Sequence, residues 1–483
     1  MHPPLRLTIL AALAAVAAPS PLAAQRKADA VTAVLAALDG KATHYAEVAK
    51  QIWGFAELGF LEVQSSALLR SELAAAGFRV DSGVAGMPTA FTATYGSGKP
   101  VIGIVGEFDA LPGLSQDATP ERKALVEGGA GHACGHHLFG TASVAAAIAV
   151  KEWMAANSVA GTVRFYGTPA EEGGSGKVYM VRDGLFDGVD VVVAWHPGDR
   201  NVADAHSTLA NISAKFRFRG VSAHAAAAPD KGRSALDAVE AMDHMVNLMR
   251  EHVPQDARIH YVITNGGRAP NVVPDFAEVY YVARHNDMRV LDGMWERIVN
   301  AANGAAMGTG TTVDLELIGA VWNVLPNEYL ARLQQKSLER VGGVPYTDEE
   351  RSFAERIQKS LDGTVPAVSS AATVMPWDGV GVAMASSDMG DVSWTVPTVQ
   401  LSTATWVPGT PAHSWQAVAA GGMAIGAKGM MVAAKTMTLT AMELFAHPEH
   451  VRNARAEFDQ RRGATFVYST KLAGRQPALD YRK

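Results

Sequence analysis

Short apolar runs alternate with longer helical patterns over the first two hundred residues of the chain. Residues 28–78 repeat apolar positions at helical spacing. Residues 101–105, 161–167 and 190–195 are apolar runs of strand length, and the alanine-rich residues 138–156 predict a buried helix. Apolar strands that alternate with helices are typical of a parallel sheet covered on both faces. The pattern therefore predicts an α/β domain with a mostly parallel central sheet flanked by helices.

The middle of the chain has a different pattern. Residues 211–218 and 272–284 alternate apolar and polar positions with a period of two, and the helical stretch 233–251 lies between them. A β–α–β–β–α–β order predicts a smaller, ferredoxin-like α+β unit inserted into the first domain. We expect a discontinuous main domain at residues 25–205 and 322–446, an inserted domain at 206–321, and a C-terminal extension at 447–483.

The first 24 residues have the layout of a cleavable secretory signal peptide. Arg6 supplies the positive charge, residues 5–18 are apolar except for that arginine and Thr8, and small residues precede Gln25. The apolar run is shorter than the ~20 residues that span a bilayer. We expect cleavage after Ala24, which gives a secreted or periplasmic protein without a membrane segment. The alternatives are an uncleaved anchor or an ordinary apolar helix.

Composition and charge exclude several classes of protein. Apolar residues make up 48% and charged residues 19% of the chain, which excludes a disordered protein. A formal net charge of −6 gives no electrostatic footprint for nucleic acid. The single cysteine, Cys134, excludes an intrachain disulfide. Cys134 is therefore either a small buried hydrophobe or a chemical group.

The C-terminal extension has its own composition. Residues 447–483 contain eight Lys and Arg against four acids, with little apolar periodicity. We interpret them as a surface extension, and an arm that binds a membrane or a partner is the alternative.

Metal-binding residue types recur in four short segments near the ends of predicted strands. They are His132–His137 (His-Ala-Cys-Gly-His-His), Pro169–Gly174, Trp195–Pro197 and Pro411–His413. Sites in open α/β sheets form beyond the carboxyl ends of strands. A converging set of thiolate, imidazole and carboxylate groups suits zinc or a neighbouring transition metal. Each residue alone is more often structural, but their recurrence at strand ends favours a metal site.

These segments, together with 222–229 and 271–274, resemble the successive signatures of the dinuclear metallopeptidase and amidohydrolase family of aminoacylases and carboxypeptidases, peptidase family M20. The resemblance implies two divalent metal ions, Zn²⁺ or Mn²⁺. The ligands that it implies are Cys134, His136, Glu172, His196 and His413, with Cys134 able to bridge the two ions. Glu171 is then the general base, which takes a proton from the attacking water and passes it to the leaving nitrogen.

Three further positions match the family's pattern or depart from it. Asp109 occupies the place of the family's acid that orients a ligating imidazole, here taken as His136. Glu107 stands where relatives have Asp, which puts any role for it in doubt. His137 stands where the family commonly has Asp or Asn, so it competes with His136 as a ligand, although the spacing favours His136.

The resemblance also implies that the inserted domain is a lid and dimerisation domain. His224 resembles the histidine that reaches a neighbouring active site across a dimer and stabilises the oxyanion. Asn271 and Arg284 resemble the groups that hold the substrate carboxylate, for which the planar guanidinium is well suited. The alternatives are a turn residue for Asn271 and a surface strand residue for Arg284.

The leading hypothesis is a metal-dependent amidohydrolase that cleaves N-acyl or N-aroyl amino acids such as aminobenzoyl-glutamate. One alternative is a carboxypeptidase or dipeptidase that acts on small peptides. Another is a non-catalytic partner subunit of a hetero-oligomeric amidohydrolase, but a binding scaffold has no need for the base Glu171. We expect a homodimer, or a heterodimer with a paralogous subunit, and no nucleic-acid partner.

Overall fold

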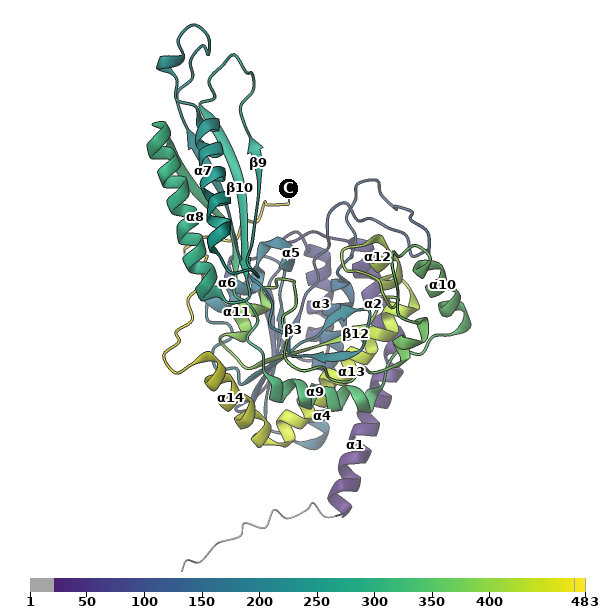
Figure 1. Ribbon diagram of the computed structural model, residues 1–483. Coiled ribbons are helices and arrows are strands. Elements are labelled where there is room, and N and C mark those ends of the chain that lie inside the picture. Colours follow the sequence, from purple (N-terminus) through teal and green to yellow (C-terminus); the bar gives the residue numbers. More distant parts are fainter. Residues whose placement is uncertain (1–20, 473, 483) are drawn as a thin grey trace, which may run out of the picture.

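The computed structural model describes residues 21–472 and 474–482, with side chains from residue 29 onward (Figure 1). Most of the expected signal peptide therefore lies outside the described residues. Helix α1 (Pro21–Gly40) begins before the expected cleavage position and continues beyond it. Two sheets with their helices make up the rest of the molecule.

The larger sheet has eight strands in the order β1-β2-β4-β3-β5-β12-β6, with β7 paired to β12. Its strands are β1 (Arg79–Ser82), β2 (Phe91–Ser97), β3 (Val101–Gly106), β4 (Gly161–Gly167), β5 (Val191–Val193), β6 (His196–Gly198), β7 (Val202–Asp204) and β12 (Thr398–Ala404). The five strands from β4 to β6 are parallel, whereas β1, β2 and β7 pair antiparallel. The prediction of a mostly parallel sheet is confirmed.

Helices cover this sheet because its central strands are apolar on both faces. Along β3, Ile102 and Ile104 join the core beneath the long helices, and Val101 and Val105 join the core on the opposite face. The helices of this domain after α1 are α2 (Ala42–Phe55), α3 (Val63–Ala75), α4 (His136–Asn157), α5 (Glu171–Gly174), α6 (Gly176–Arg182), α9 (Glu328–Val341), α10 (Asp348–Gln358), α11 (Met389–Ser393), α12 (Trp415–Gly421) and α13 (Ala424–Ala446). Short 3₁₀ turns lie at Val84–Gly86 and Val368–Ala372.

Helix α4 lies at the centre of this packing. By length and composition it qualifies as a membrane span, as does the bent pair α12 and α13 taken together. In the structure, 83% of the most apolar window of α4 is buried inside the protein, packed against α13 and β3. Its apolar character is therefore used in the protein core.

The inserted domain is a four-stranded antiparallel sheet in the order β11-β8-β10-β9, with two helices on one face. Its elements are β8 (Ala210–Arg219), α7 (Ala235–Met249), β9 (Arg258–Asn265), β10 (Phe276–His285), α8 (Met288–Thr309) and β11 (Thr312–Val321), with 3₁₀ turns at Pro229–Lys231 and Arg250–His252. Alternate residues of β10 are buried against the helices. The predicted β–α–β–β–α–β order is confirmed. We call this domain, residues 210–321, the blade, because it projects from the larger sheet (Figure 1).

The C-terminal region differs from the expected surface extension. Residues 448–462 form helix α14 (Pro448–Arg462), with Phe458 buried. Beyond it the chain is irregular but packed, since Leu472 is 1% exposed. Its charges and weak apolar periodicity predict a surface extension, but Lys471 pairs with Asp292 of α8 and Arg461 with Glu328 of α9.

Candidate metal centre

The candidate ligands come together at one edge of the larger sheet. Cys134 and His136 lie at the start of α4 rather than at a strand end, because the long loop after β3 intervenes. Gly135 between them adopts a left-handed φ of 77°, and a Cβ there would lie 2.6 Å from Cβ of Pro197. Glycine therefore allows this turn to approach the segment that carries His196.

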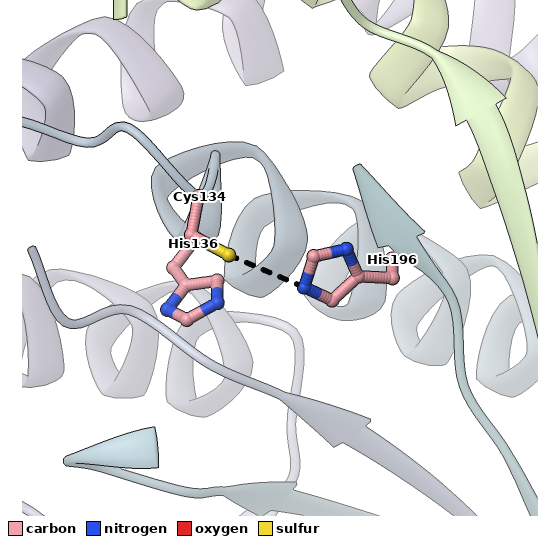
Figure 2. A group of neighbouring side chains, drawn as sticks. All are labelled: Cys134, His136 and His196. Atoms are coloured by element: carbon pink, nitrogen blue, oxygen red, sulfur yellow. Dashed lines mark hydrogen bonds between the residues drawn. The ribbon is translucent and has the colours of Figure 1, made fainter. Parts of the chain in front are cut away.

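One group of donors consists of Cys134, His136 and His196, and Figure 2 shows the sulfur of Cys134 pointing toward the ring of His196. The Sγ of Cys134 lies 3.5 Å from Nε2 of His196. One ligand atom from each of the three residues lies within 4.8 Å of the other two. Cys134 and His136 are buried, so few waters compete for these donors.

A second group of donors consists of Cys134, Glu172 and His413, again with ligand atoms within 4.8 Å of one another. The Nε2 of His413 lies 3.0 Å from Oε1 of Glu172. The backbone N–H of His413 donates to the carbonyl of Ala133, which places the distant His413 segment beside the cysteine. Cys134 belongs to both groups and is therefore placed to bridge two ions.

Asp109 contacts one residue of each donor group, His136 in the first and Glu172 in the second. Its Oδ1 lies 2.9 Å from Nδ1 of His136, and its Oδ2 accepts a hydrogen bond of 2.9 Å from the backbone N–H of Glu172. Burial acts to raise the pKa of Asp109, but the interactions with His136 and Glu172 outweigh it and lower that pKa. The carboxylate thus fixes the ring of His136 with Nε2 facing the donor groups.

Glu171 and Glu172 are adjacent in sequence but belong to different groups of donors. They lie in an irregular turn, in which Ala170 is left-handed and Glu172 has φ −71° and ψ 64°. Glu171 lies in a third group, with Glu107 and His136. Burial, followed by the nearby carboxylates of Glu107 and Glu172, raises the pKa of Glu171 well above its usual range.

Buried atoms without hydrogen-bond partners test whether a metal fits here. Among the described residues, Nε2 of His136, Oε1 of Glu172 and Oε2 of Glu107 are buried and make no hydrogen bond. Each still lies near a polar atom, since Nε2 of His136 is 3.0 Å from Oε2 of Glu107 and Oε1 of Glu172 is 3.0 Å from Nε2 of His413. Buried polar atoms that lack a hydrogen bond are costly and rare in native proteins. His136 and Glu172 supply two of these atoms and belong to the two donor groups. A thiolate, imidazoles and carboxylates at these separations fit divalent cations.

A buried lysine beside the base is absent from the sequence-based predictions. Lys177 is fully buried, and its Nζ lies 2.7 Å from Oε1 of Glu107 and 2.6 Å from Oδ1 of Asp388. Residues 173–177 superficially resemble a phosphate loop, but in the structure the ammonium of Lys177 forms ion pairs with two carboxylates of its own chain. Asp388 lies 211 residues from Lys177, and no local pattern predicts that contact.

His137 does not compete with His136 for a metal. Its Nε2 lies 3.0 Å from the carbonyl oxygen of Gly421, and it belongs to none of the donor groups. Burial lowers the pKa of His137, which favours a neutral ring. The alternative in which His137 is a ligand is therefore not supported by the geometry. Glu107, whose role is in doubt from the sequence, contacts both His136 and Lys177 in the structure.

The three candidates of the inserted domain make no hydrogen bond or ion pair with the donor groups in the described part of the chain. His224 and Asn271 lie in paired loops beyond the ends of β8 and β9, at the tip of the blade (Figure 1). Arg284 is half-buried near the opposite end of β10. Among the described residues, no hydrogen bond or ion pair joins these three side chains to Cys134 or to the rest of the donor groups.

The donor groups at the edge of a mostly parallel sheet, with a carboxylate beside them, define a metal-dependent hydrolase. The chain belongs to peptidase family M20/M25/M40, whose family model matches residues 103–416. It binds divalent metal ions and is an amidohydrolase of this family.

Relatives extend this likeness over most of the chain. It is 42% identical over 450 residues to the B subunit of p-aminobenzoyl-glutamate hydrolase of Escherichia coli (strain K12), covering 88% of this chain and 94% of that protein. It is 28% identical over 437 residues to Xaa-Arg dipeptidase of Mus musculus, covering 87% and 90%. An aminobenzoyl-glutamate utilization protein from Klebsiella pneumoniae shares the fold, with a TM-score of 0.57, 18% identity, and coverage of 84% and 97%.

Proposed function

We propose that this chain hydrolyses the amide bond of N-acyl or N-aroyl amino acids, with Glu171 as the general base. The observation that carries the proposal is the pair of donor groups that share Cys134, with Glu171 beside them. Cys134, His136 and His196 would hold one divalent ion, and Cys134, Glu172 and His413 the other. The mixed sulfur, nitrogen and oxygen donors suit Zn²⁺ or Mn²⁺.

The residues divide the chemistry between them. When bound, divalent ions polarise a carbonyl and lower the pKa of water. Glu171 accepts a proton from the attacking water and returns it to the nitrogen of the leaving amino acid, so that the proton is conserved in the amide cleavage. Asp109 keeps the ring of His136 in its ligating orientation. His224, from a second copy of the chain, donates a hydrogen bond to the oxyanion.

The substrate class follows from the relatives. The relative with 42% identity is named for p-aminobenzoyl-glutamate, which joins an aroyl group to an amino acid with a free carboxylate. We infer that this chain takes the same class of substrate, held by Asn271 and Arg284 at the carboxylate. The likeness to Xaa-Arg dipeptidase supports a second candidate, dipeptide hydrolysis.

A panel of substrates separates the two candidates. Aminobenzoyl-, benzoyl- and acetyl-glutamate would be compared with dipeptides that end in glutamate or arginine. Aroyl-glutamate turnover well above dipeptide turnover supports the first candidate, and the reverse order supports the second. Chelation or Glu171→Gln should reduce turnover of either substrate by about 10²–10⁴-fold. Full activity after both treatments would contradict the mechanism.

We also propose that the working enzyme is a dimer of like chains, or a dimer with a paralogous subunit. The second form is supported by similarity to two different subunits of the Escherichia coli (strain K12) hydrolase. The chain is 42% identical to the B subunit and 27% identical, over 326 residues, to the A subunit. The mass and turnover of the chain purified alone distinguish the two forms. An active homodimer contradicts an obligate heterodimer and a non-catalytic role.

The N-terminal residues favour export of the chain. The sequence of residues 1–24 supports a signal peptide cleaved after Ala24, with the mature protein secreted or periplasmic. The mass of the protein recovered from the cell envelope fraction tests it. A mature chain that begins at Gln25 is expected, and an intact chain in the cytoplasmic fraction would contradict export.

A further inference from the structure

The irregular segment after α14 connects three parts of the molecule. We call its described residues, 463–472 and 474–482, the C-terminal strap. In Figure 1 the strap leaves α14, passes the foot of α8 and ends, marked C, between the blade and α5. Lys471 forms an ion pair of 2.6 Å with Asp292 of α8, and Tyr468 donates a hydrogen bond of 2.7 Å to Asp391 of α11. The strap is therefore fastened to both domains.

The end of the strap reaches the metal centre. The phenol of Tyr481 donates to the carbonyl oxygen of Glu172 at 3.1 Å, and Nη2 of Arg482 donates to the same oxygen at 2.7 Å. Glu172 is the candidate ligand of the second donor group, and its side-chain Oε1 lies 3.0 Å from His413. The carbonyl of a candidate metal ligand is thus held by two donors from a segment about 300 residues further along the chain.

The side chain of Tyr481 packs closely against Gly59 and Phe60. Its ring meets the edge of the ring of Phe60, with centroids 5.6 Å apart and an interplanar angle of 71°. A Cβ on Gly59 would lie 2.2 Å from the Tyr481 oxygen and 2.9 Å from Cβ of Ala170. Glycine at position 59 therefore leaves the space that the phenol fills, immediately beside the loop that carries Glu171 and Glu172.

That loop needs support from outside itself. Ala170 and Ser175 both have φ of 57°, and Gly173 has φ of 97°. Left-handed conformations of residues other than glycine are unfavourable and persist only where the surroundings enforce them. Asp109 holds the backbone N–H of Glu172 from one side, and the strap holds its carbonyl from the other.

We propose that Tyr481 and Arg482 are positioning residues, which fix the Glu172 loop so that its carboxylate is preorganised for metal binding. The proposal rests on the role of Glu172 as a ligand given under the proposed function. Partners that orient a ligand change metal affinity by about 10–100-fold when removed. The strap would then be part of the metal centre rather than a surface extension.

The experiment measures metal affinity directly and needs no substrate. Metal-free protein would be titrated with Zn²⁺ or Mn²⁺ against a chelating dye, for the unaltered chain and for Arg482→Ala, Tyr481→Phe and Arg482→Lys. We expect Arg482→Ala to weaken the binding of one of two ions by about 10-fold or more. Tyr481→Phe should weaken it only a few-fold, because it removes the neutral donor at 3.1 Å and keeps the charged guanidinium at 2.7 Å. Arg482→Lys should restore most of the affinity, because a lysine ammonium also donates to a carbonyl.

Two controls separate positioning from general stability and from substrate binding. Lys471→Ala loosens the strap at α8 without touching Glu172, so metal affinity should not change. The thermal midpoint of the metal-free protein should be the same for Arg482→Ala and the unaltered chain. An unchanged metal affinity in Arg482→Ala would overturn the proposal, including when KM alone rises. An equal loss of affinity in Lys471→Ala would also overturn it. The titration needs no turnover, so its result tests the positioning role separately from the substrate assays.

Discussion

Several candidate residues are buried at the metal-bearing edge of the larger sheet, whereas those at the tip of the inserted domain are exposed. At the edge, Cys134 and His136 are buried, and Asp109 already bonds the imidazole. At the tip, His224 is exposed, and its Nδ1 accepts hydrogen bonds of 3.2 Å from two backbone N–H groups of its own loop. The first region is assembled within one chain, whereas the second holds an exposed imidazole through its Nδ1 alone.

The difference shows how preorganisation is distributed in this enzyme. Buried donors with fixed partners give a metal centre that needs little rearrangement. A histidine held at the end of a rigid antiparallel blade is precise in its own loop but distant from that centre. Its contribution requires either a large movement of the blade or a second copy of the chain.

The largest effect is expected at the residue that both donor groups share. Cys134→Ala removes the common sulfur, so the protein should lose its metal and at least about 10³-fold of its activity, since metal polarisation supplies several kcal/mol of transition-state stabilisation. Elemental analysis after desalting and steady-state assays measure both. The fold should be retained, because alanine fits a small buried position. Two bound ions and full activity in this variant would return Cys134 to the role of a buried hydrophobe.

The second effect concerns the charge buried beside the base. Lys177→Met leaves the carboxylates of Glu107 and Asp388 facing each other without their cation, which should cost about 3–5 kcal/mol of unfolding free energy. Urea denaturation of the metal-free protein measures the loss. Lys231→Met, on the exposed turn of the blade, is the matched control and should change stability by less than ~0.5 kcal/mol. Equal stability of the two variants would mean that the edge does not depend on its buried ion pairs.

Periodicity predicts the elements that are long enough to show it. Helix α4 and strands β8 and β10 follow from the sequence, because each repeats its apolar pattern over several residues. Strands β6 and β7 have three residues each, too few to display a period, whereas the equally short β5 follows from the apolar run at residues 190–195. The ligand segments follow from residue type and from the family resemblance. The contact between Lys177 and Asp388, and the approach of the strap to Glu172, are tertiary and have no local signal.

The third prediction tests the tip of the blade. His224→Ala should lower kcat by about 10²–10³-fold, the usual effect of an oxyanion donor. If His224 acts in a second copy, mixing this inactive variant with inactive Glu171→Gln should restore about a quarter of the activity, since about half the reassorted dimers are mixed and each mixed dimer has one complete site. Assays after subunit exchange measure it. No recovery despite proven exchange would show that His224 acts within its own chain.

The smallest effect lies inside the blade, which has a buried acid of its own. Tyr281 donates a hydrogen bond to Asp243, and burial raises the pKa of Asp243 to about 6. As the pH rises from about 4 to 6, the unfolded chain loses this proton before the folded chain does, so the unfolding free energy should fall by about 1–2 kcal/mol. Asp243→Asn keeps an acceptor for Tyr281 and should remove that fall. Urea denaturation at pH 4, 5, 6 and 7 measures it, with Asp362→Asn, an exposed acid, as the matched control. A pH dependence that is the same in both variants would mean that the blade, unlike the metal-bearing edge, tolerates its buried acid in the charged form.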